Sequence, residues 1–269
     1  MNNPLVSIIT PCYNDGKYLM ECVQCVREVS YSNIEHIIID DGSTDLATLS
    51  IIEELKKASD LKIIITENQG VCRAKQKAIN ESSGKYILPL DADDLISKEF
   101  INLAVCELEK DNEVSLVVTD YKYFGKRRDI IRLEEYSLSR LLGRNLFVNS
   151  SIFRKEDFIR AGGYNENMKE GFEDWDLWIN LLKREGKVKK VNNIHFFYRI
   201  KKRKESRNAS IDSDRFSRLR KNIWINHQEL YSKIYVDPKD MFEFVSINNS
   251  LEYRIVKFLL KPIRNFIGY

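Results

Sequence analysis

Apolar runs of strand length alternate with amphipathic helical patterns along the first part of the chain. Runs rich in Ile, Val and Leu, each bounded by turn residues, predict buried strands. Between them, apolar positions three and four residues apart predict helices. The expected strands span 5–10, 34–40, 61–66 and 85–91, and the expected helices span 18–30, 46–59 and 70–82. Such alternation is typical of an α/β domain with parallel strands.

Polar side chains gather where each predicted strand ends. After the four strands come, in order, Pro11, Tyr13, Asn14 and Asp15; Asp40 and Asp41; Asn68 and Gln69; and Asp91, Asp93 and Asp94. Ligands of open α/β sheets bind beyond the carboxyl ends of the strands. We therefore expect these side chains to line one crevice.

The three aspartates of "ILPLDADDL" raise a question of charge. Neighbouring carboxylates repel one another and are costly to remove from water. Mg²⁺ or Mn²⁺ takes oxygen ligands and is commonly shared with substrate phosphates, so a divalent cation would stabilise the cluster. The alternative is a solvated turn in which Asp94 caps a helix starting near Ser97.

The sequence contains neither of the two common phosphate-binding loops. The chain has neither G-x-G-x-x-G nor G-x-x-x-x-G-K-[ST], so a dinucleotide-dependent or NTPase function is not supported. Tyr13 can stack on a base, and Asp41 can accept a hydrogen bond from a base imide. That pair of roles suits a pyrimidine nucleotide.

A second acidic pair opens a predicted helix within "GFEDWDLWINLL". The pattern predicts a helix that begins near Glu173 and buries Trp175 and the following apolar residues. The helix dipole favours Glu173 and Asp174 in the first turn, where we expect both acids to face outward. In isolation, the pair would be an ordinary acidic helix terminus.

Five segments in this order resemble the inverting family 2 glycosyltransferases, which have the glycosyltransferase A-type fold. They are "VSIITPCYNDGKYL", "IIIDDGSTD", "NQGV", "GKYILPLDADD" and "GFEDWDLWINLL". The resemblance covers roughly residues 4–200. It implies an α/β nucleotide-diphospho-sugar transferase fold, with a mostly parallel central sheet flanked by helices, followed here by a helical C-terminal tail.

The resemblance also implies how the donor base and ribose are held. Pro11 and Tyr13 match the family's first loop, with Tyr13 stacking on the base, and Asp41 matches the residue that reads the base. Asp91 and Ala92 begin the D-x-D motif, in which the first aspartate helps to hold the ribose.

By the same resemblance, Asp93 is the principal ligand of a Mn²⁺ or Mg²⁺ ion that bridges the donor phosphates. Lys75 stands where many relatives have Arg, so it can meet a phosphate without the bidentate fork. Many relatives also have Tyr-Arg-x-His, whereas this chain has Tyr198 and Arg199 with Lys201 in place of the histidine, so the family's histidine metal ligand is not expected at this position. The basic run 199–207 is either a flexible lid that neutralises diphosphate or a solvated loop.

Asp174 matches the family's catalytic base. It would take the proton from an acceptor hydroxyl during a single displacement that inverts the anomeric configuration, while the metal at Asp93 stabilises the departing nucleoside diphosphate. Glu173 and Trp175 are expected to shape the acceptor pocket.

The expected organisation is a nucleotide-sugar-binding half (1–110), an acceptor-binding half with the base (111–205) and a basic helical extension (206–269). "VSLVVTDYKYFG" is interpreted as a strand pair, and His195 as structural. In the tail (251–269), one predicted helical face beside Arg and Lys residues carries Leu251, Ile255, Phe258, Leu259, Ile263 and Phe266. This face either packs on the protein's own core or a second copy, or lies on an anionic membrane surface.

Charge and cysteine content bear on nucleic-acid binding and on the location of the protein. The net charge of +3 is a small difference between 43 basic and 40 acidic residues, so nucleic acid is not an expected partner. Five scattered cysteines, with no secretory signal and no membrane-spanning apolar run, favour a cytoplasmic protein, with peripheral attachment to the inner membrane face as an open alternative.

The sequence therefore predicts transfer of a sugar from a nucleotide-diphosphate donor to a hydroxyl of a glycan or lipid-linked acceptor in surface polysaccharide assembly. The expected donor is a UDP-sugar. Two alternatives stay open. A noncatalytic nucleotide-sugar-binding scaffold would share the fold and bind the donor without turnover. A sugar nucleotidyltransferase should have a glycine-rich phosphate loop near its N-terminus, which "SIITPCYNDGKYL" lacks.

Overall fold

The computed structural model describes residues 3–201, 213–235, 250–251, 255–256 and 258–260. The chain divides into two compact units, 1–226 and 227–269. The second unit contains helix α9 (Gln228–Ile234). Residues 202–207 of the predicted lid and much of the predicted tail helix lie outside the described residues. Within the described ranges, no helix has the length and apolarity needed to cross a membrane.

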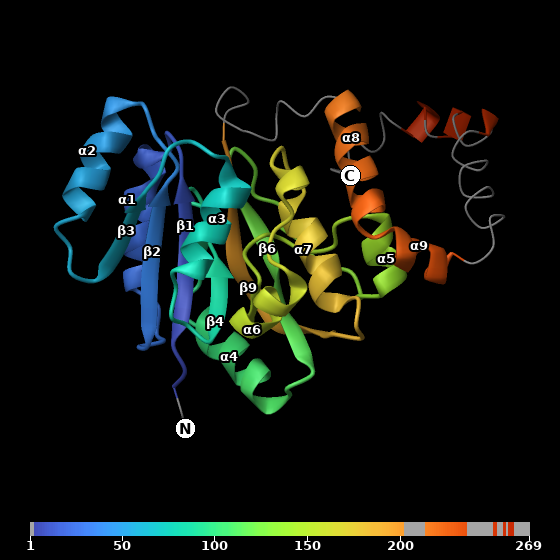
Figure 1. The fold of residues 1–269 in the computed structure, drawn as a ribbon, viewed down its shortest axis with the longest axis horizontal. Coiled ribbons are helices and arrows are strands. Elements are labelled where there is room, and N and C mark those ends of the chain that lie inside the picture. The colour runs from blue at the N-terminus through green and yellow to red at the C-terminus, as the bar shows by residue number, and fades with distance from the viewer. Residues whose placement is uncertain (1–2, 202–212, 236–249, 252–254, 257, 261–269) are drawn as a thin grey trace. The chain divides into compact units, whose positions relative to one another are not determined.

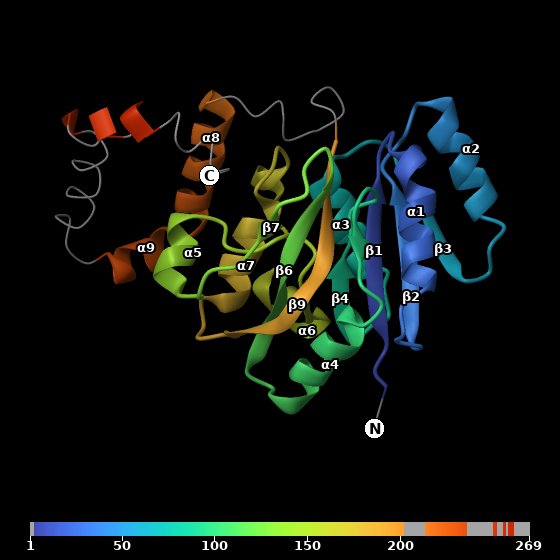
Figure 2. The same ribbon diagram turned by 180° about the vertical axis from the view of Figure 1, so that it is seen from behind.

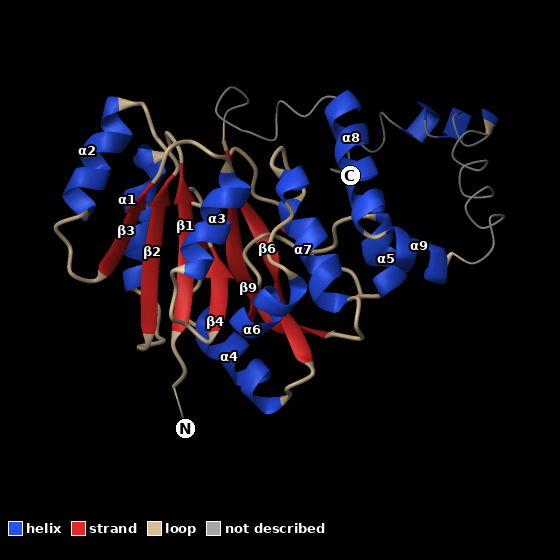
Figure 3. Ribbon diagram, viewed as in Figure 1, coloured by secondary structure: helices blue, strands red, loops and turns tan. Residues whose placement is uncertain are grey.

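The first half of the larger unit is the predicted parallel sheet. The strands β1 (Val6–Cys12), β2 (Ile34–Asp40), β3 (Leu61–Ile65) and β4 (Tyr86–Pro89) lie side by side in the order β3-β2-β1-β4. They alternate with the helices α1 (Gly16–Arg27), α2 (Leu46–Leu55) and α3 (Val71–Asn80). The carboxyl ends of β1, β2 and β3 point to the same edge of the sheet (Figure 3). All four predicted strands and all three predicted helices are present.

The second half makes the sheet mixed. Beyond β4 come β8 (Ile152–Arg154), β6 (Val114–Gly125), β9 (Lys187–Ile200) and β5 (Leu95–Ile96), with β7 (Ile130–Ile131) paired to β6. β8 is antiparallel to both neighbours, whereas β6 and β9 are parallel. The prediction of a strand pair within 114–125 was wrong. The register shifts around Asp120 let one continuous strand bend along β9 without turning back.

Helices cover both faces of the sheet. α1 and α4 (Phe100–Lys110) lie on one face, and α3, α6 (Lys155–Ala161) and α7 (Glu173–Leu182) lie on the other (Figures 1 and 2). The remaining helices of the unit are α5 (Leu138–Gly143), the 3₁₀ turn η1 (Glu166–Met168) and α8 (Ser213–Asn226). One apolar cluster fills the space between the sheet and α1 and α4, with Ile8, Leu88, Phe100 and Val117 fully buried.

The segment after the aspartates differs from the capped turn considered above. α4 begins at Phe100, and its N-cap residue is Glu99. Asp94 is buried before β5, and its Oδ1 accepts the backbone N–H of Arg199 at 2.8 Å. Asp94 therefore ties the D-x-D segment to β9 instead of capping a helix.

Candidate active site

Asp41 organises the loop that leads from β3 to α3. Its Oδ1 accepts the backbone N–H of Gln69 and its Oδ2 that of Gly70, each at 2.9 Å. The adjacent Gly42 has φ +72°, and a Cβ there would lie 2.6 Å from the backbone N of Asn68. Only glycine fits this close turn without displacing the neighbouring loop. Asp41 thus lies, buried, where two strand-end loops meet.

The loop after β1 presents Tyr13. Asn14 adopts the left-handed conformation (φ 54°), and its Oδ1 accepts the backbone N–H groups of Thr44 and Asp45. These bonds fix the loop against the end of β2, while Tyr13 remains 47% exposed. Pro11 lies in β1 opposite Ile39 of β2. The ring of Tyr13 is therefore accessible at the sheet edge.

Asp91 enters a buried polar cluster. Its Oδ1 accepts the Asn149 side-chain amide at 3.1 Å and lies 3.4 Å from Lys75 Nζ. Lys75 is buried and also contacts Asn149 Oδ1 at 3.0 Å and Glu173 Oε1 at 3.2 Å. Ala92, the next residue, is buried in the apolar cluster that includes Cys12 and Leu19. Lys75 therefore joins the D-x-D segment to the start of α7.

Asp93 is paired with a lysine from the far end of β9. Asp93 Oδ2 lies 2.9 Å from Lys201 Nζ, which also contacts Asp15 Oδ1 at 2.7 Å. Burial raises the pKa of the Asp93 carboxyl, with Asp91 adding to the effect and Lys201 opposing it. Burial alone would lower the pKa of Lys201, but Asp93 and Asp15 outweigh it and raise that pKa.

Arg199 also contacts the D-x-D segment, through the backbone of Asp93. Its Nε donates to the backbone oxygen of Asp93 at 2.7 Å, and its Nη2 donates to Glu21 at 2.6 Å. The guanidinium lies over the rings of Tyr18 and Phe124, at 4.7 and 4.2 Å from their centres. The planar group is thus held by two rings and an ion pair, so it fixes the backbone that carries Asp93.

Asp174 lies in the first turn of α7, in an environment that disfavours its charge. Asn145 donates to its Oδ2 at 3.0 Å, and the backbone N–H of Trp175 donates to its Oδ1 at 2.8 Å. Burial, followed by the neighbouring Glu173, raises the pKa of Asp174 to about 6, despite the opposing influence of Lys75. A carboxylate with a pKa near neutrality suits a general base.

The residues on either side of Asp174 face inward. Glu173 is buried against Lys75, contrary to the expectation that both acids of the first turn face outward. Trp175 is also buried, and its Nε1 donates to the backbone oxygen of Leu141 at 2.6 Å. Phe172, the N-cap residue of α7, has φ 60°, a left-handed conformation that costs of order 1–3 kcal/mol in a residue other than glycine.

The structure brings together Asp91, Lys75 and Glu173, and it adds two asparagines that were not predicted from the sequence. Asn149 bonds to both Lys75 and Asp91, and Asn145 bonds to Asp174. Both come from "GRNLFVNSS", between α5 and β8. The one signal that the sequence offers is that the two asparagines flank the apolar triplet Leu-Phe-Val.

The side chains around Asp93 offer few ligands for a divalent cation. Within the described ranges, no three His, Cys, Asp or Glu side chains come together at a metal-binding spacing. Asp93 nevertheless offers a carboxylate oxygen at the strand edge, and Mg²⁺ commonly binds one or two carboxylates plus substrate phosphates and water. The residues therefore fit an ion shared with a diphosphate, and they do not fit one held by protein ligands alone.

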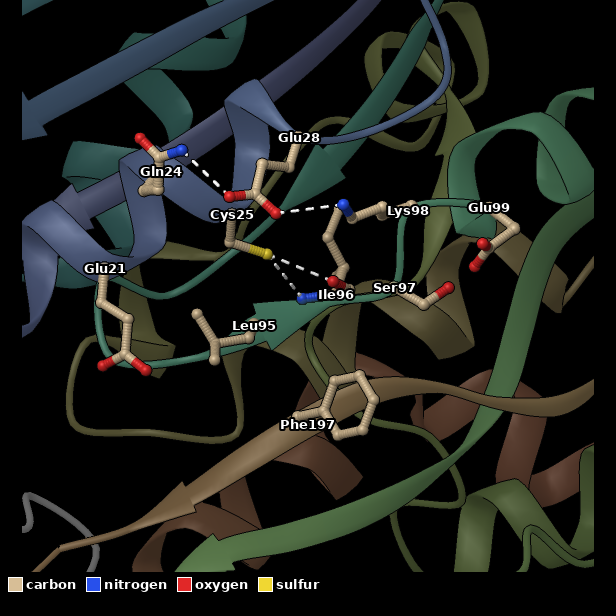
Figure 4. A pocket seen from close by; sticks show the side chains of 10 residues that line it. All are labelled: Glu21, Gln24, Cys25, Glu28, Leu95, Ile96, Ser97, Lys98, Glu99 and Phe197. Carbon is tan, nitrogen blue, oxygen red and sulfur yellow. Dashed lines mark hydrogen bonds and ion pairs between the residues drawn. The ribbon is translucent and has the colours of Figure 1, made fainter.

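A pocket of about 560 Å³ lies apart from these groups, between α1, β5 and β9 (Figure 4). The thiol of Cys25 donates to the backbone oxygen of Ile96, and Glu28 is paired with Lys98 at its rim. The lining of this pocket includes none of the candidate site residues Tyr13, Asp41, Lys75, Asp91, Asp93, Glu173 and Asp174. Its edge does include Glu21, the partner of Arg199.

Comparison with known proteins gives the class of this fold and site. Residues 7–176 match Glycosyl transferase family 2. The chain is 32% identical over 214 residues to Glycosyltransferase GlyG of Streptococcus pneumoniae, across 72% of this chain and 70% of that protein. It is 29% identical over 196 residues to chondroitin synthase of Escherichia coli, across 71% of this chain and 28% of that protein. The chain thus spans less than a third of that synthase.

A solved structure shows the same architecture. S. aureus TarS 1–349 in complex with UDP-GlcNAc superposes with a TM-score of 0.69 at 19% identity, covering 82% of this chain and 66% of that chain. The fold is that of the glycosyltransferase A type. The protein belongs to glycosyl transferase family 2, as the five sequence segments predicted.

Proposed function

We propose that this protein transfers a sugar from a nucleoside diphosphate donor, a UDP-sugar, to a hydroxyl of a glycan or lipid-linked acceptor, with inversion at the anomeric carbon. The observation that carries the proposal is the buried connection from Asp91 through Lys75 to Glu173, which adjoins Asp174. These contacts link the carboxyl ends of the parallel strands, where we place the nucleotide, to Asp174, whose pKa is raised. Membership of the family supports the reaction class.

Asp174 is the catalytic base in this proposal. It accepts the proton of the acceptor hydroxyl as that oxygen attacks the anomeric carbon and the bond to the diphosphate breaks. Asn145 and the backbone of Trp175 hold one carboxylate oxygen each, which fixes the direction of the remaining lone pairs. A positioned base of this kind contributes about 10²- to 10⁴-fold to the rate.

Tyr13 and Asp41, which follow the carboxyl ends of β1 and β2, would recognise the nucleotide. Tyr13 offers an exposed ring for the base. Asp41 Oδ1 accepts both the Gln69 N–H and the Thr66 hydroxyl, so Oδ2, which accepts the Gly70 N–H, is the oxygen whose second lone pair can accept from a base imide. Pro11, Asp91 and Ala92 border the ribose. These roles favour a pyrimidine nucleotide.

Cations of the chain would neutralise the leaving diphosphate. Lys201 Nζ bridges Asp93 and Asp15, so a diphosphate bound at Asp93 would lie within reach of this ammonium. Lys75 is itself buried and contacts the side chains of Asn149, Asp91 and Glu173, so we assign it to holding Asp91 and Glu173 in place. Mn²⁺ or Mg²⁺, when bound with the donor at Asp93, supplies further stabilisation of the negative charge on the departing diphosphate.

We further propose a cytoplasmic protein that acts in surface polysaccharide assembly at the inner membrane face. The supporting observation is in the smaller unit, where the apolar side chains of Leu251, Ile255, Phe258 and Leu259 are exposed. Such a face fits an anionic membrane surface, and self-association through these residues is the alternative.

A donor screen tests the proposed function. Purified protein with Mn²⁺ is incubated with sugar nucleotides that differ in base and sugar, and nucleotide release is followed with and without acceptors. Release from at least one UDP-sugar, increased by an acceptor, is expected. Donor binding without release from any sugar nucleotide would favour the scaffold, and formation of a sugar nucleotide from a nucleoside triphosphate and a sugar phosphate would favour the nucleotidyltransferase.

A further inference from the structure

Helix α8 places an aromatic and a cationic side chain beside the start of α7. Leu219 and Ile223 of α8 are buried, and Asn226 donates to Asp176 of α7 at 2.7 Å, so the helix is anchored to the larger unit. Phe216 and Arg220 lie on the adjoining part of the same helical stripe, where Phe216 is 44% exposed and Arg220 is exposed. The apolar residues thus attach α8, while Phe216 and Arg220 remain accessible.

Arg220 is positioned by stacking and by one hydrogen bond. Its guanidinium carbon lies 5.7 Å from the ring centre of Trp175 and 6.0 Å from that of Phe216. Its Nη2 donates to the backbone oxygen of Gly143 at 3.1 Å. Among the described residues, no carboxylate forms an ion pair with Arg220, whereas Arg218 on the same helix is paired with Glu170.

These contacts lead directly to the candidate base. Trp175, under the guanidinium, follows Asp174 in the chain and donates its backbone N–H to that carboxylate. Gly143 is two residues before Asn145, the other donor to Asp174. Phe172 packs edge-on against both Trp175 and Phe216, with ring centres 5.4 and 5.5 Å apart. Arg220 and Phe216 therefore contact Trp175 and Phe172, the two aromatic residues between which Asp174 lies in the sequence.

We propose that Phe216 and Arg220 form an acceptor subsite that selects a glycan bearing an anionic group, either a carboxylate or a phosphate. The exposed ring of Phe216 provides a face for a sugar ring. The guanidinium carries five N–H donors in a planar fork that matches both anions, and among the residues that the structure describes it makes one hydrogen bond, to Gly143. This inference rests on the proposed function, because it names the acceptor class for the same base.

Binding to an array of neutral, uronate-containing and phosphate-containing glycans, in the presence of UDP, tests the subsite. We expect the bound glycans to be acidic, and the two acidic sets identify which anion is preferred. Arg220→Gln should reduce binding to those glycans by about ten- to a hundredfold, as expected for loss of a charge-assisted hydrogen bond. Lys221→Gln removes the same charge from the neighbouring exposed position and should have little effect.

Two further measurements separate charge recognition from a structural role of Arg220. Arg220→Lys should restore part of the binding, and raising the salt concentration should weaken binding to the wild type more than to Arg220→Gln. With an acceptor from the array, Arg220→Gln should raise the acceptor KM, while acceptor-independent nucleotide release stays unchanged. Equal binding of neutral and acidic glycans, or undiminished binding by Arg220→Gln, would overturn the subsite. Failure of the wild type to release nucleotide would instead count against the proposed function.

Discussion

Lys201 Nζ lies 2.9 Å from Asp93 Oδ2, so the aspartate proposed to bind a cation already faces one from the chain itself. The same ammonium contacts Asp15, which follows the loop that carries Tyr13. One lysine thus connects the D-x-D segment to the nucleotide loop. The pairing explains how Asp93 is accommodated at a buried edge without a metal held by protein ligands alone.

Lys201→Ala should change how UDP binding depends on metal. Removal of the ammonium frees Asp93, so we expect tighter Mn²⁺ binding in the presence of UDP, together with weaker UDP binding in the presence of a chelator, by about tenfold for a lost charge-assisted bond. Calorimetric titrations with and without Mn²⁺ measure both effects. Lys57→Ala, at an exposed position on the α2 side, provides the control. Identical metal dependence in Lys201→Ala and wild type would exclude a shared site.

Tyr13→Ala should weaken UDP binding by about tenfold while leaving the fold intact, because the ring is exposed and stacking on a base contributes about 1–3 kcal/mol. Tyr13→Phe retains the ring and should bind UDP like the wild type. Calorimetry gives the affinities, and thermal unfolding checks the fold. If Tyr13→Ala binds UDP normally, the base lies elsewhere.

The activity should depend on the ionisation of Asp174. Only the carboxylate can accept a proton, and the pKa of this group is raised to about 6. We therefore expect kcat/KM to rise as the pH increases through about 6 and to fall below it. The groups around it are the carboxylate Glu173 and the ammonium of Lys75, with Asn145 as a donor.

The variant Asn145→Ala sharpens this test. It removes a hydrogen bond that favours the charged form of Asp174, so the pKa of Asp174 should rise further and the acidic limb of the profile should move to higher pH. The pH profiles of wild type and variant are compared with one donor and one acceptor. A profile that does not move would show that the limb belongs to another group.

The buried pair of Lys75 and Glu173 should matter for stability. Their side chains are 1% and 7% exposed, so Lys75→Met leaves a buried carboxylate unpaired and should lower the free energy of unfolding by about 3–5 kcal/mol. The double variant Lys75→Met/Glu173→Gln removes both charges and should recover part of that loss. Denaturant titrations of both variants measure the effect. Equal stability of Lys75→Met and wild type would show that the pair is dispensable.

The parallel half of the fold could be predicted because each of its strands is a separate apolar run beside a helix with its own periodicity. The bend in β6 could not, since it depends on register shifts against β9, which is more than sixty residues away in the sequence. The inward orientation of the Glu173 side chain could not be predicted from the sequence either. Helix dipole arguments place an acid in the first turn, but only the tertiary position of Lys75 turns this one inward.

The candidate site was predicted in part for the same reason. Asp41, Asp91, Asp93 and Asp174 follow strand ends or open a helix, so local pattern and the family resemblance identify them together. Asn145 and Asn149 lie in a loop with no regular pattern, and their partners are 29 and 58 residues away in the sequence. The pairing of Lys201 with Asp93 likewise requires β9 to return to the edge of the sheet.

Sugar transfer by Asp174→Asn tests the central claim most directly. The amide keeps the size of the side chain but cannot act as the base, so donor binding, measured by calorimetry with the same UDP-sugar, should be retained. Transfer to the acceptor should fall by about two to four orders of magnitude. Transfer at close to the wild-type rate by a folded Asp174→Asn protein would contradict the account, because Asp174 would then be an acidic residue at a helix terminus and not the base.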